Sequence, residues 1–247
     1  MAYSPLEQFE VNILYPLSFL SSFDISITNS TIYMFFSFSF FSFLLFLGTK
    51  TLLLIPHRYQ LVVELLYQFI FDMVKGQATL KGQRYFPIIF VTFGFVLLSN
   101  VLGLTPYAFT PTSHIIITFM LAFSFFVGLT LIGFMRQGSS FLSLFIPSGV
   151  PVAILPLMIL IEIMSYCIRP ISLSVRLFAN MLAGHTLLHI VAGFGVKLMS
   201  NSILYAILPI LLLLAITVLE FGIAFLQAYV FVILLSIYLN DSILVAH

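Results

Sequence analysis

The stretch RPISLSVRLFANMLAGHTLLH, residues 169–189, determines how the rest of the chain must be interpreted. It contains two permanent cations, Arg169 and Arg176, yet it lies inside an apolar run that extends from Pro147 to Lys197. No charged or Gly/Pro-rich loop interrupts this run to close a hairpin. A helix of about 50 residues would be roughly 70 Å long, whereas the hydrocarbon core of a bilayer is about 30 Å thick.

Two arrangements fit a run of this length. Either two spans meet at a tight turn near Pro170, or one long helix crosses the membrane with a strong tilt. The next apolar run, Ile203–Leu239, raises the same question, because as a helix it would be about 55 Å long. Tilted helices are the less usual arrangement, and the length alone does not decide between the two.

The composition defines the class of protein. Of the 247 residues, 62% are hydrophobic and 7% are charged, whereas soluble domains are roughly 45–50% apolar and about 25% charged. The chain is therefore predicted to be an all-α polytopic membrane protein. A net charge of +1 without a basic patch speaks against nucleic acid as a partner. The single cysteine, Cys167, excludes an internal disulfide framework.

The remaining elements follow from apolar runs and their periodicity. Between Lys50 and Arg84, Leu61, Leu65 and Phe69 recur every four residues opposite charged side chains, which indicates an amphipathic helix on the membrane surface. The predicted elements are a span at 32–49, the surface helix at 57–76, spans at 85–104 and 113–135, and long helices at 149–196 and 203–240. They form one integral membrane domain, residues 1–247.

The distribution of basic residues predicts the orientation. The segment between the first two spans holds five Lys and Arg residues, whereas residues 1–31 and 105–112 hold none. Because cytoplasmic-type loops carry the excess of positive charge, the N-terminus is expected to face outward, away from the compartment of synthesis.

Polar residues within the two long runs form a stripe on each helix. Glu162, Arg169 and Arg176 are spaced by seven residues and share one helical face, which Asn180 continues. Glu220 and Gln227 are also seven apart in the last run, and Asp241 drifts only modestly from their face. A purely structural role, with these groups paired inside a helix bundle, is the simplest alternative.

The cost of burying charge favours a functional role for the whole set. A charge at the bilayer centre costs between about 2.5 and 17 kcal/mol unless it is solvated or paired, and such residues normally mark an ion or proton path. Glu162 can pair with Arg169, which leaves Arg176 without an evident carboxylate in this chain. Arginine does not release its proton, so Arg176 is expected to attract a buried acid of a second membrane protein.

Two stretches carry a family resemblance. SVRLFANMLAGH, residues 174–185, and LEFGIAFLQAYVFVILLSIYLND, residues 219–241, resemble subunit a of the rotary F-type ATP synthases, and SPLEQFE, GLTPY and TSH extend the likeness. His185 together with Glu220 is similar to the mitochondrial form, since bacterial and plastid relatives typically have an acid at the position of His185. The resemblance implies an N-terminal span, a surface helix, a two-helix hairpin and two long tilted helices facing a rotor ring.

The resemblance also implies a function. It suggests a stator subunit of the proton-translocating CF(0) membrane sector that provides two half-channels and couples proton flow to ATP synthesis. Asn180, His185, Glu220 and Gln227 would line the entry side, whereas Glu162 and Asp241 would belong to the matrix side. Arg169 would be a supporting cation of the proton path, paired with Glu162. Arg176 would interact with the ring carboxylates and block a direct proton leak.

The implied setting is the mitochondrial inner membrane, with the N-terminus in the intermembrane space and the C-terminus in the matrix. The implied partners are the c-subunit rotor ring, other membrane-sector and peripheral-stalk subunits, and membrane lipids. The chain is not expected to be an enzyme by itself, because it contains no GxxxxGK[ST] nucleotide-binding loop.

His185 and His189 lie four residues apart on one face, a spacing that can hold zinc with Glu220 as a third ligand, although a pair of pore or core histidines without a cofactor is the simpler interpretation. A secondary transporter is a rival function, but that class usually shows internal repeats, whereas the polar residues here are confined to the C-terminal half. A structural scaffold is a weaker rival.

Overall fold

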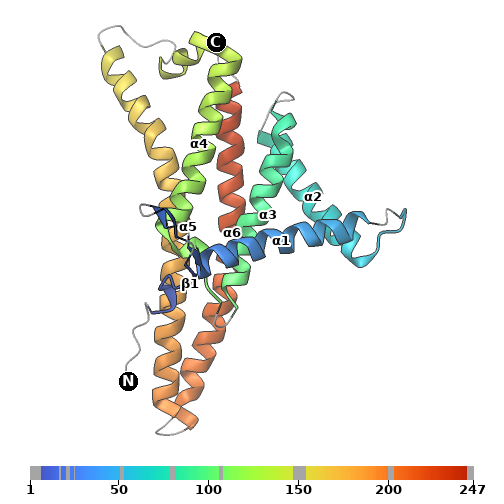
Figure 1. Cartoon of the computed structure of the whole chain (residues 1–247), viewed down its shortest axis with the longest axis vertical. Helices are drawn as coiled ribbons and strands as arrows, with labels where there is room; N and C mark the ends of the chain where they lie inside the picture. Colours follow the sequence, from blue (N-terminus) through green and yellow to red (C-terminus); the bar gives the residue numbers. More distant parts are fainter. Residues whose placement is uncertain are drawn as a thin grey trace. The chain divides into compact units, whose positions relative to one another are not determined.

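The computed structural model describes residues 7–16, 18–20, 23–24, 26–50, 53–77, 82–105, 108–146, 154–199 and 203–243. Almost all of the described chain after residue 28 is helical (Figure 1). Among the described residues, five helices are long and apolar enough to cross a membrane. These helices are Asn29–Thr49, Gln83–Gly103, Ile115–Gln137, Leu155–Met199 and Tyr205–Ile243. The prediction of an all-α polytopic membrane protein is confirmed.

The first span, α1 (Asn29–Thr49), is a helix despite the alternation of Phe and Ser in its sequence. A lone strand in lipid would leave its backbone amides and carbonyls without partners, whereas a helix satisfies them internally. Its N-terminus is fixed by hydroxyl groups, since the Thr31 hydroxyl donates to the Thr28 carbonyl at 2.7 Å and accepts from the Thr28 amide at 3.0 Å.

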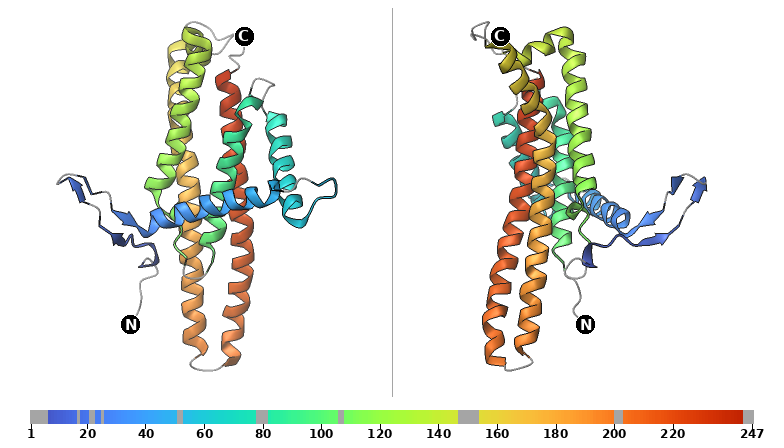
Figure 2. Two further views of the ribbon diagram at one scale, coloured as in Figure 1. Left: turned by 45° about the vertical axis from the view of Figure 1, so that its right-hand side comes forward. Right: turned by 90° about the vertical axis from the view of Figure 1, so that its left-hand side faces the viewer.

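Four short strands precede α1, and the sequence analysis did not predict them. Strand β1 (Ile13–Tyr15) pairs antiparallel with β4 (Ile27–Thr28), and β2 (Ser18–Leu20) pairs antiparallel with β3 (Phe23–Asp24). The strands form a narrow ribbon that runs into α1 (Figure 2). β-Branched and aromatic residues such as Ile13, Tyr15 and Ile27 favour strands, but segments of two or three residues carry too little periodicity to be predicted.

Helix α2 (Arg58–Gln77) has the amphipathic character that the sequence indicates, and it packs on neighbouring residues through side chains outside the predicted apolar row. Ile70 and Val74 are buried, and the ring centroid of Tyr67 lies 4.9 Å from that of Phe86. Leu61 and Leu65, which belong to the predicted apolar row, are 45% and 58% exposed. The location of α2 on a membrane surface stays a prediction.

Helices α3 and α4 follow. A 3₁₀ turn at Gln83–Tyr85 leads into α3 (Phe86–Gly103), and a second one at Pro111–Ser113 precedes α4 (Ile115–Gln137). Gly138 ends α4 with a φ of 58°, a left-handed conformation that glycine adopts without steric cost, and the 3₁₀ segment η4 (Gly138–Phe145) follows. Pro106 and Tyr107 of the GLTPY motif lie outside the described residues.

Each of the two long apolar runs forms one continuous helix. Helix α5 (Leu155–Met199) has 45 residues and includes Pro170, and α6 (Ile203–Ile243) has 41 residues and includes Pro209. The alternative of two spans meeting near Pro170 is therefore wrong. The predicted start of α5 at residue 149 falls on positions 149–153, which lie outside the described residues. Helices of roughly 67 and 62 Å exceed the bilayer core of about 30 Å.

The chain divides into two compact units, and both long helices contribute to each. The first unit consists of Met1–Phe46, Gly94–Ile115 and Leu177–Ala228, and the second of Leu47–Phe93, Ile116–Arg176 and Tyr229–His247. In the first unit, the ring of Phe41 packs directly on Gly94, where a Cβ atom would collide with it. Leu177 and Met181 of α5 and Ala224 and Ala228 of α6 supply further core side chains there.

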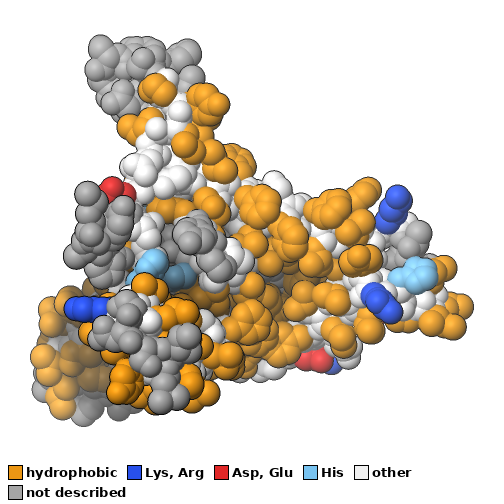
Figure 3. Space-filling view, turned by 90° about the horizontal axis from the view of Figure 1, so that it is seen from below, with side chains coloured by type: hydrophobic (Ala, Val, Ile, Leu, Met, Phe, Trp, Pro, Cys, Tyr) orange, Lys and Arg blue, Asp and Glu red, His pale blue; other side chains and the backbone are white. Residues whose placement is uncertain are grey.

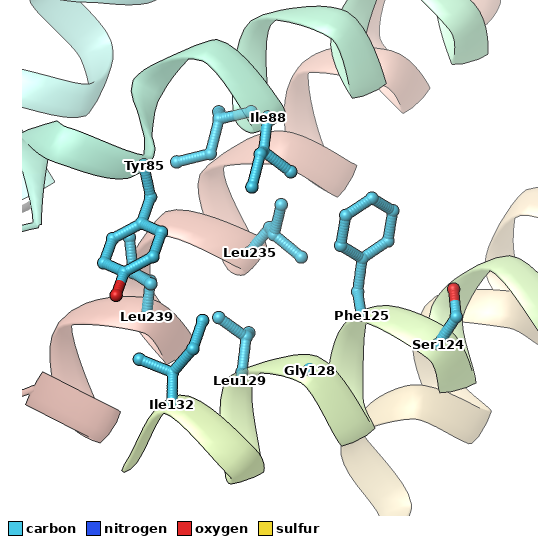
Figure 4. Close-up of a pocket in the computed structure, with 10 residues that line it drawn as sticks. Tyr85, Ile88, Ser124, Phe125, Gly128, Leu129, Ile132, Leu235 and Leu239 are labelled. Atoms are coloured by element: carbon cyan, nitrogen blue, oxygen red, sulfur yellow. The ribbon is translucent and has the colours of Figure 1, made fainter. Parts of the chain in front are cut away.

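The second unit has an aromatic and aliphatic core with an apolar cavity of about 240 Å³ (Figure 4). The cavity is lined by Tyr85, Ile88, Ile89, Ser124, Phe125, Gly128, Leu129, Ile132, Leu235 and Leu239. None of the polar residues singled out in the sequence lines this cavity. Hydrophobic side chains also dominate the face of the molecule in Figure 3.

Candidate functional site

In the first unit, α5 and α6 are joined by a bond between two neutral amides. The Nδ2 of Asn180 donates to the Oε1 of Gln227 at 2.9 Å. The Gln227 side chain is buried, with its residue 6% exposed, whereas Asn180 is exposed. The two residues that the sequence placed on separate polar stripes are therefore in direct contact.

His185 and Glu220 are both buried in the same unit, but they do not bond to each other. Their residues are 8% and 6% exposed. The Nε2 of His185 and both carboxylate oxygens of Glu220 have no hydrogen-bond partner among the described residues. The carboxylate lies against Gly184, since a Cβ atom built there would be 3.0 Å from Glu220 Oε1. The missing side chain at Gly184 thus makes room for Glu220 at the residue that precedes His185 in α5.

Neutral polar residues of α1, α3 and the 3₁₀ turn Pro111–Ser113 (η3) were not predicted from the sequence. The Thr112 hydroxyl donates to Asn100 Oδ1 at 2.9 Å, and Asn100 Nδ2 donates to the carbonyl of Ala224 at 3.4 Å. Ala224 lies one turn beyond Glu220, so Asn100 contacts the polar face of α6. Ser99 donates to Ser37 of α1 at 3.1 Å. All of these polar side chains are buried, and polar residues in otherwise apolar spans are the signal that could have identified them.

In the second unit, Arg169 is surrounded by acidic and aromatic groups. Its Nη1 lies 3.4 Å from Asp241 Oδ2, and its Nη2 lies 4.0 Å from Glu162 Oε1. Its guanidinium also lies over the rings of Tyr238 and Tyr166, at 4.9 and 5.5 Å from their centroids. The expected pairing with Glu162 is present, but Asp241 of α6 is the closer partner. Arg169 is thus a cation held by two carboxylates and two aromatic rings.

Arg176 differs sharply from Arg169. It is an exposed residue of α5, and it forms no hydrogen bond or ion pair with any residue that the structure describes. The nearby Leu173 and Leu177 are apolar and buried, whereas Ser172, Val175 and Asn180 are exposed. A permanent positive charge therefore stands on an apolar helix without compensation from the described part of the chain.

The histidine pair does not form a complete metal site. His185 is buried and His189 is exposed on α5. No group of three or more His, Cys, Asp or Glu side chains that could hold a metal occurs within the described ranges. The role of Glu220 as a third ligand therefore stays a prediction.

The structure thus places the sequence-predicted residues in two polar groups. Asn180, His185, Glu220 and Gln227 belong to the first unit, whereas Glu162, Arg169 and Asp241 belong to the second. Partly or fully buried ionisable groups along two long apolar helices define a polytopic membrane protein of the class that conducts ions or protons.

Comparison with known proteins identifies the family. Residues 31–240 match the model of the ATP synthase A chain family, and the chain belongs to this family. ATP synthase subunit a of Acanthamoeba castellanii is 47% identical over 248 residues, which cover 100% of both chains. The subunit a of Pelagibacter ubique is 49% identical over 247 residues, again covering 100% of both chains. That of Brassica napus is 47% identical over 253 residues, covering 98% of this chain and 97% of its own.

The family membership gives the chain its general role. It is a subunit of the proton-translocating membrane sector of an ATP synthase. Of the functions that the sequence left open, the secondary transporter and the structural scaffold are both set aside by this result.

Proposed function

We propose that the chain is the stator subunit that supplies two proton half-channels beside a rotor ring of c subunits. In this proposal the first-unit group of Asn180, His185, Glu220 and Gln227 lines the entry half-channel. The second-unit group of Glu162, Arg169 and Asp241 lines the half-channel that opens to the opposite side. The division of these residues between two compact units supports two separate paths.

The environment of Arg176 is the main support for this proposal. Its charge is exposed on an apolar helix and has no partner among the described residues, whereas Arg169 has two carboxylates. A charge in such a setting is costly unless it meets an opposite charge, and a carboxylate of a ring subunit provides one. Coulomb attraction to Arg176 favours the ionised form of that carboxylate. The same charge repels protons and separates the two half-channels.

Proton flow then couples to rotation. A ring carboxylate takes up a proton from the entry half-channel, turns through the lipid as a neutral acid and releases the proton on the other side. Each proton that crosses a potential of 100 mV supplies about 2.3 kcal/mol. The nucleotide chemistry of the complex belongs to other subunits, because this chain has no phosphate-binding loop.

The setting that we propose is the mitochondrial inner membrane. The N-terminus would lie in the intermembrane space and the C-terminus in the matrix, in agreement with the five basic residues of the segment between the first two spans. The proposed partners are the c ring, other membrane-sector and peripheral-stalk subunits, and membrane lipids. The apolar cavity of about 240 Å³ is large enough for part of a lipid acyl chain, since a cavity of roughly 150 Å³ holds benzene.

Replacement of Arg176 by Ala in the intact complex tests the proposal. ATP synthesis in reconstituted vesicles should be lost, while passive proton conductance through the assembled complex should rise. Arg169→Ala is the matched control, because the carboxylates it leaves behind are partly exposed and can be solvated. It should only slow synthesis. Near-normal synthesis by Arg176→Ala, with assembly verified on a native gel, would overturn the proposal.

A further inference from the structure

The N-terminal 3₁₀ turn η1 (Glu7–Phe9) lies against His185. The rings of Phe9 and His185 meet edge-to-face, with centroids 6.3 Å apart and an interplanar angle of 81°. Both residues belong to the first unit. Because His185 is 8% exposed, the turn contributes to the burial of a residue that we place on the proton path.

Asn29 at the start of α1 fixes the position of this turn. Its Nδ2 donates to the carbonyl of Glu10 at 3.0 Å, and its backbone amide donates to the carbonyl of Asn12 at 3.2 Å. The pairing of β1 with β4, with Ile13 opposite Thr28, also ties the segment after the turn to the residues just before α1. Phe9 immediately precedes Glu10, so the beginning of the first span sets where its ring lies.

Three elements that form this contact or touch a residue next to it carry buried polar atoms without hydrogen-bond partners among the described residues. These atoms are Nε2 of Gln8 in η1, Nε2 of His185 in α5, and both carboxylate oxygens of Glu220 in α6. Gln8 adjoins Phe9, which touches His185, and Glu220 touches Gly184, which adjoins His185. Buried polar groups are normally satisfied, and a site with two to four such groups is suited to bridging water.

We propose that the turn Glu7–Phe9 is part of the proton-entry site, an inference that rests on the function proposed above for His185 and Glu220. Phe9 is a positioning residue that holds the imidazole ring and closes one side of the site. The Gln8 amide is the third polar group of a water-bridged set with His185 and Glu220. It donates hydrogen bonds and does not release a proton.

The chemistry of the three groups is complementary. The Gln8 nitrogen is a donor, the Glu220 carboxylate accepts when it is ionised, and imidazole can accept at one nitrogen while it donates at the other. Water molecules between them provide a chain along which a proton moves by exchange of hydrogen bonds. An aromatic ring at the side of this chain restricts rotation of the imidazole and excludes other water from it.

Three variants in the full complex test the inference, with ATP-driven proton pumping into vesicles as the assay. Loss of the aromatic pair in Phe9→Ala should slow pumping by about 2- to 10-fold, the range that an aromatic contact implies. Phe9→Tyr keeps the ring and should retain most of the rate. Gln8→Leu removes the amide at similar size and should slow pumping as well. The matched control is Val11→Ala, because Val11 lies on the same segment but is 48% exposed.

A double-mutant cycle separates a place on the path from a structural role. Glu220→Gln alone should slow pumping, and addition of Phe9→Ala or Gln8→Leu should then cause little further loss. Fully additive losses, or normal rates in both Phe9→Ala and Gln8→Leu, overturn the inference. If Phe9→Ala prevents assembly on a native gel, a normal rate in Gln8→Leu overturns it by itself. A normal rate in Glu220→Gln would instead remove the proposed function on which the inference rests.

Discussion

The side-chain amide of Asn180 donates a hydrogen bond to that of Gln227 across 2.9 Å and so joins the two longest helices of the protein. Neither amide carries a charge or releases a proton. The pair therefore cannot relay protons by itself, and the role that we propose for it on the proton path is to hold α5 and α6 in register and to orient water.

Replacement of one member of this pair should cost more than replacement of both. Asn180→Leu leaves the buried Gln227 amide without its partner, which costs about 1–3 kcal/mol, whereas the double change to Leu removes both polar groups. We expect the single variant to lower the thermal midpoint of the assembled membrane sector and the double variant to restore part of it. Equal destabilisation by both would show that the bond does not contribute to stability.

The ion pair of Arg169 with Asp241 should contribute more than that with Glu162. Asp241 Oδ2 is 3.4 Å from the guanidinium, whereas Glu162 Oε1 is 4.0 Å away. Because all three side chains are partly exposed, the coupling is expected to be about 1 kcal/mol or less. ATP synthesis should fall more in Asp241→Asn than in Glu162→Gln, and a double-mutant cycle with Arg169→Gln gives the coupling. The opposite order would contradict this arrangement.

His114, which immediately precedes α4, should make the stability of the complex depend on pH. Burial holds the pKa of His114 below the ordinary value of 6.5, and its ring stacks on Phe109 at 5.1 Å. The unfolded chain therefore binds the proton more readily, so this contribution is present at neutral pH and is lost as the pH falls below about 6.5.

The measurement is the thermal midpoint of the complex between pH 7.5 and 5.5. His114→Phe keeps the aromatic stack and removes the titrating group, so its midpoint should fall less over this range. An identical pH dependence in the variant would assign the effect to other groups.

Zinc should bind the His185 and His189 pair only weakly, because two protein ligands make an incomplete site, and it should therefore slow proton flow only weakly. The two histidines are four residues apart on α5, and no third protein ligand joins them among the described residues. Protein zinc sites normally have three or four protein ligands. Inhibition of proton pumping by micromolar zinc should be relieved in His189→Ala, and unchanged inhibition in that variant would place the metal elsewhere.

The sequence predicted most of what depends on charge and on long apolar runs. The spacing of Glu162, Arg169 and Arg176 identified the polar face of α5, because a seven-residue step returns nearly to the same side of a helix. The sequence could not show that Pro170 lies inside a continuous helix, since proline in a helix is tolerated when neighbouring groups satisfy the freed carbonyl.

What the sequence did not reveal depends on contacts between distant segments. Asn100 and Thr112 are neutral, so no charge or periodicity marked the bond of Thr112 to Asn100 or that of Asn100 to the carbonyl of Ala224 in α6. Asp241 drew attention as part of the α6 stripe, but its pairing with Arg169 across 72 positions follows only from the antiparallel packing of the two helices. The contact of Phe9 with His185 likewise joins residues that no local pattern connects.

Arg176→Lys separates the need for a positive charge from the need for a guanidinium. Lysine keeps the charge but presents a compact ammonium without the planar fork of arginine, and it can lose its proton when it is desolvated. Arg176 stands exposed on an apolar helix without a partner among the described residues, so the position favours a cation that stays charged in lipid surroundings. We expect Arg176→Lys to lose ATP synthesis almost as completely as Arg176→Ala, with less passive proton leak because part of the charge barrier remains.

Arg169→Lys is the matched control and should keep most of the rate, since two carboxylates stabilise the ammonium there. Synthesis and passive conductance are measured in the same vesicles after assembly is verified. Normal synthesis by Arg176→Lys would show that any cation suffices and that the guanidinium has no specific role.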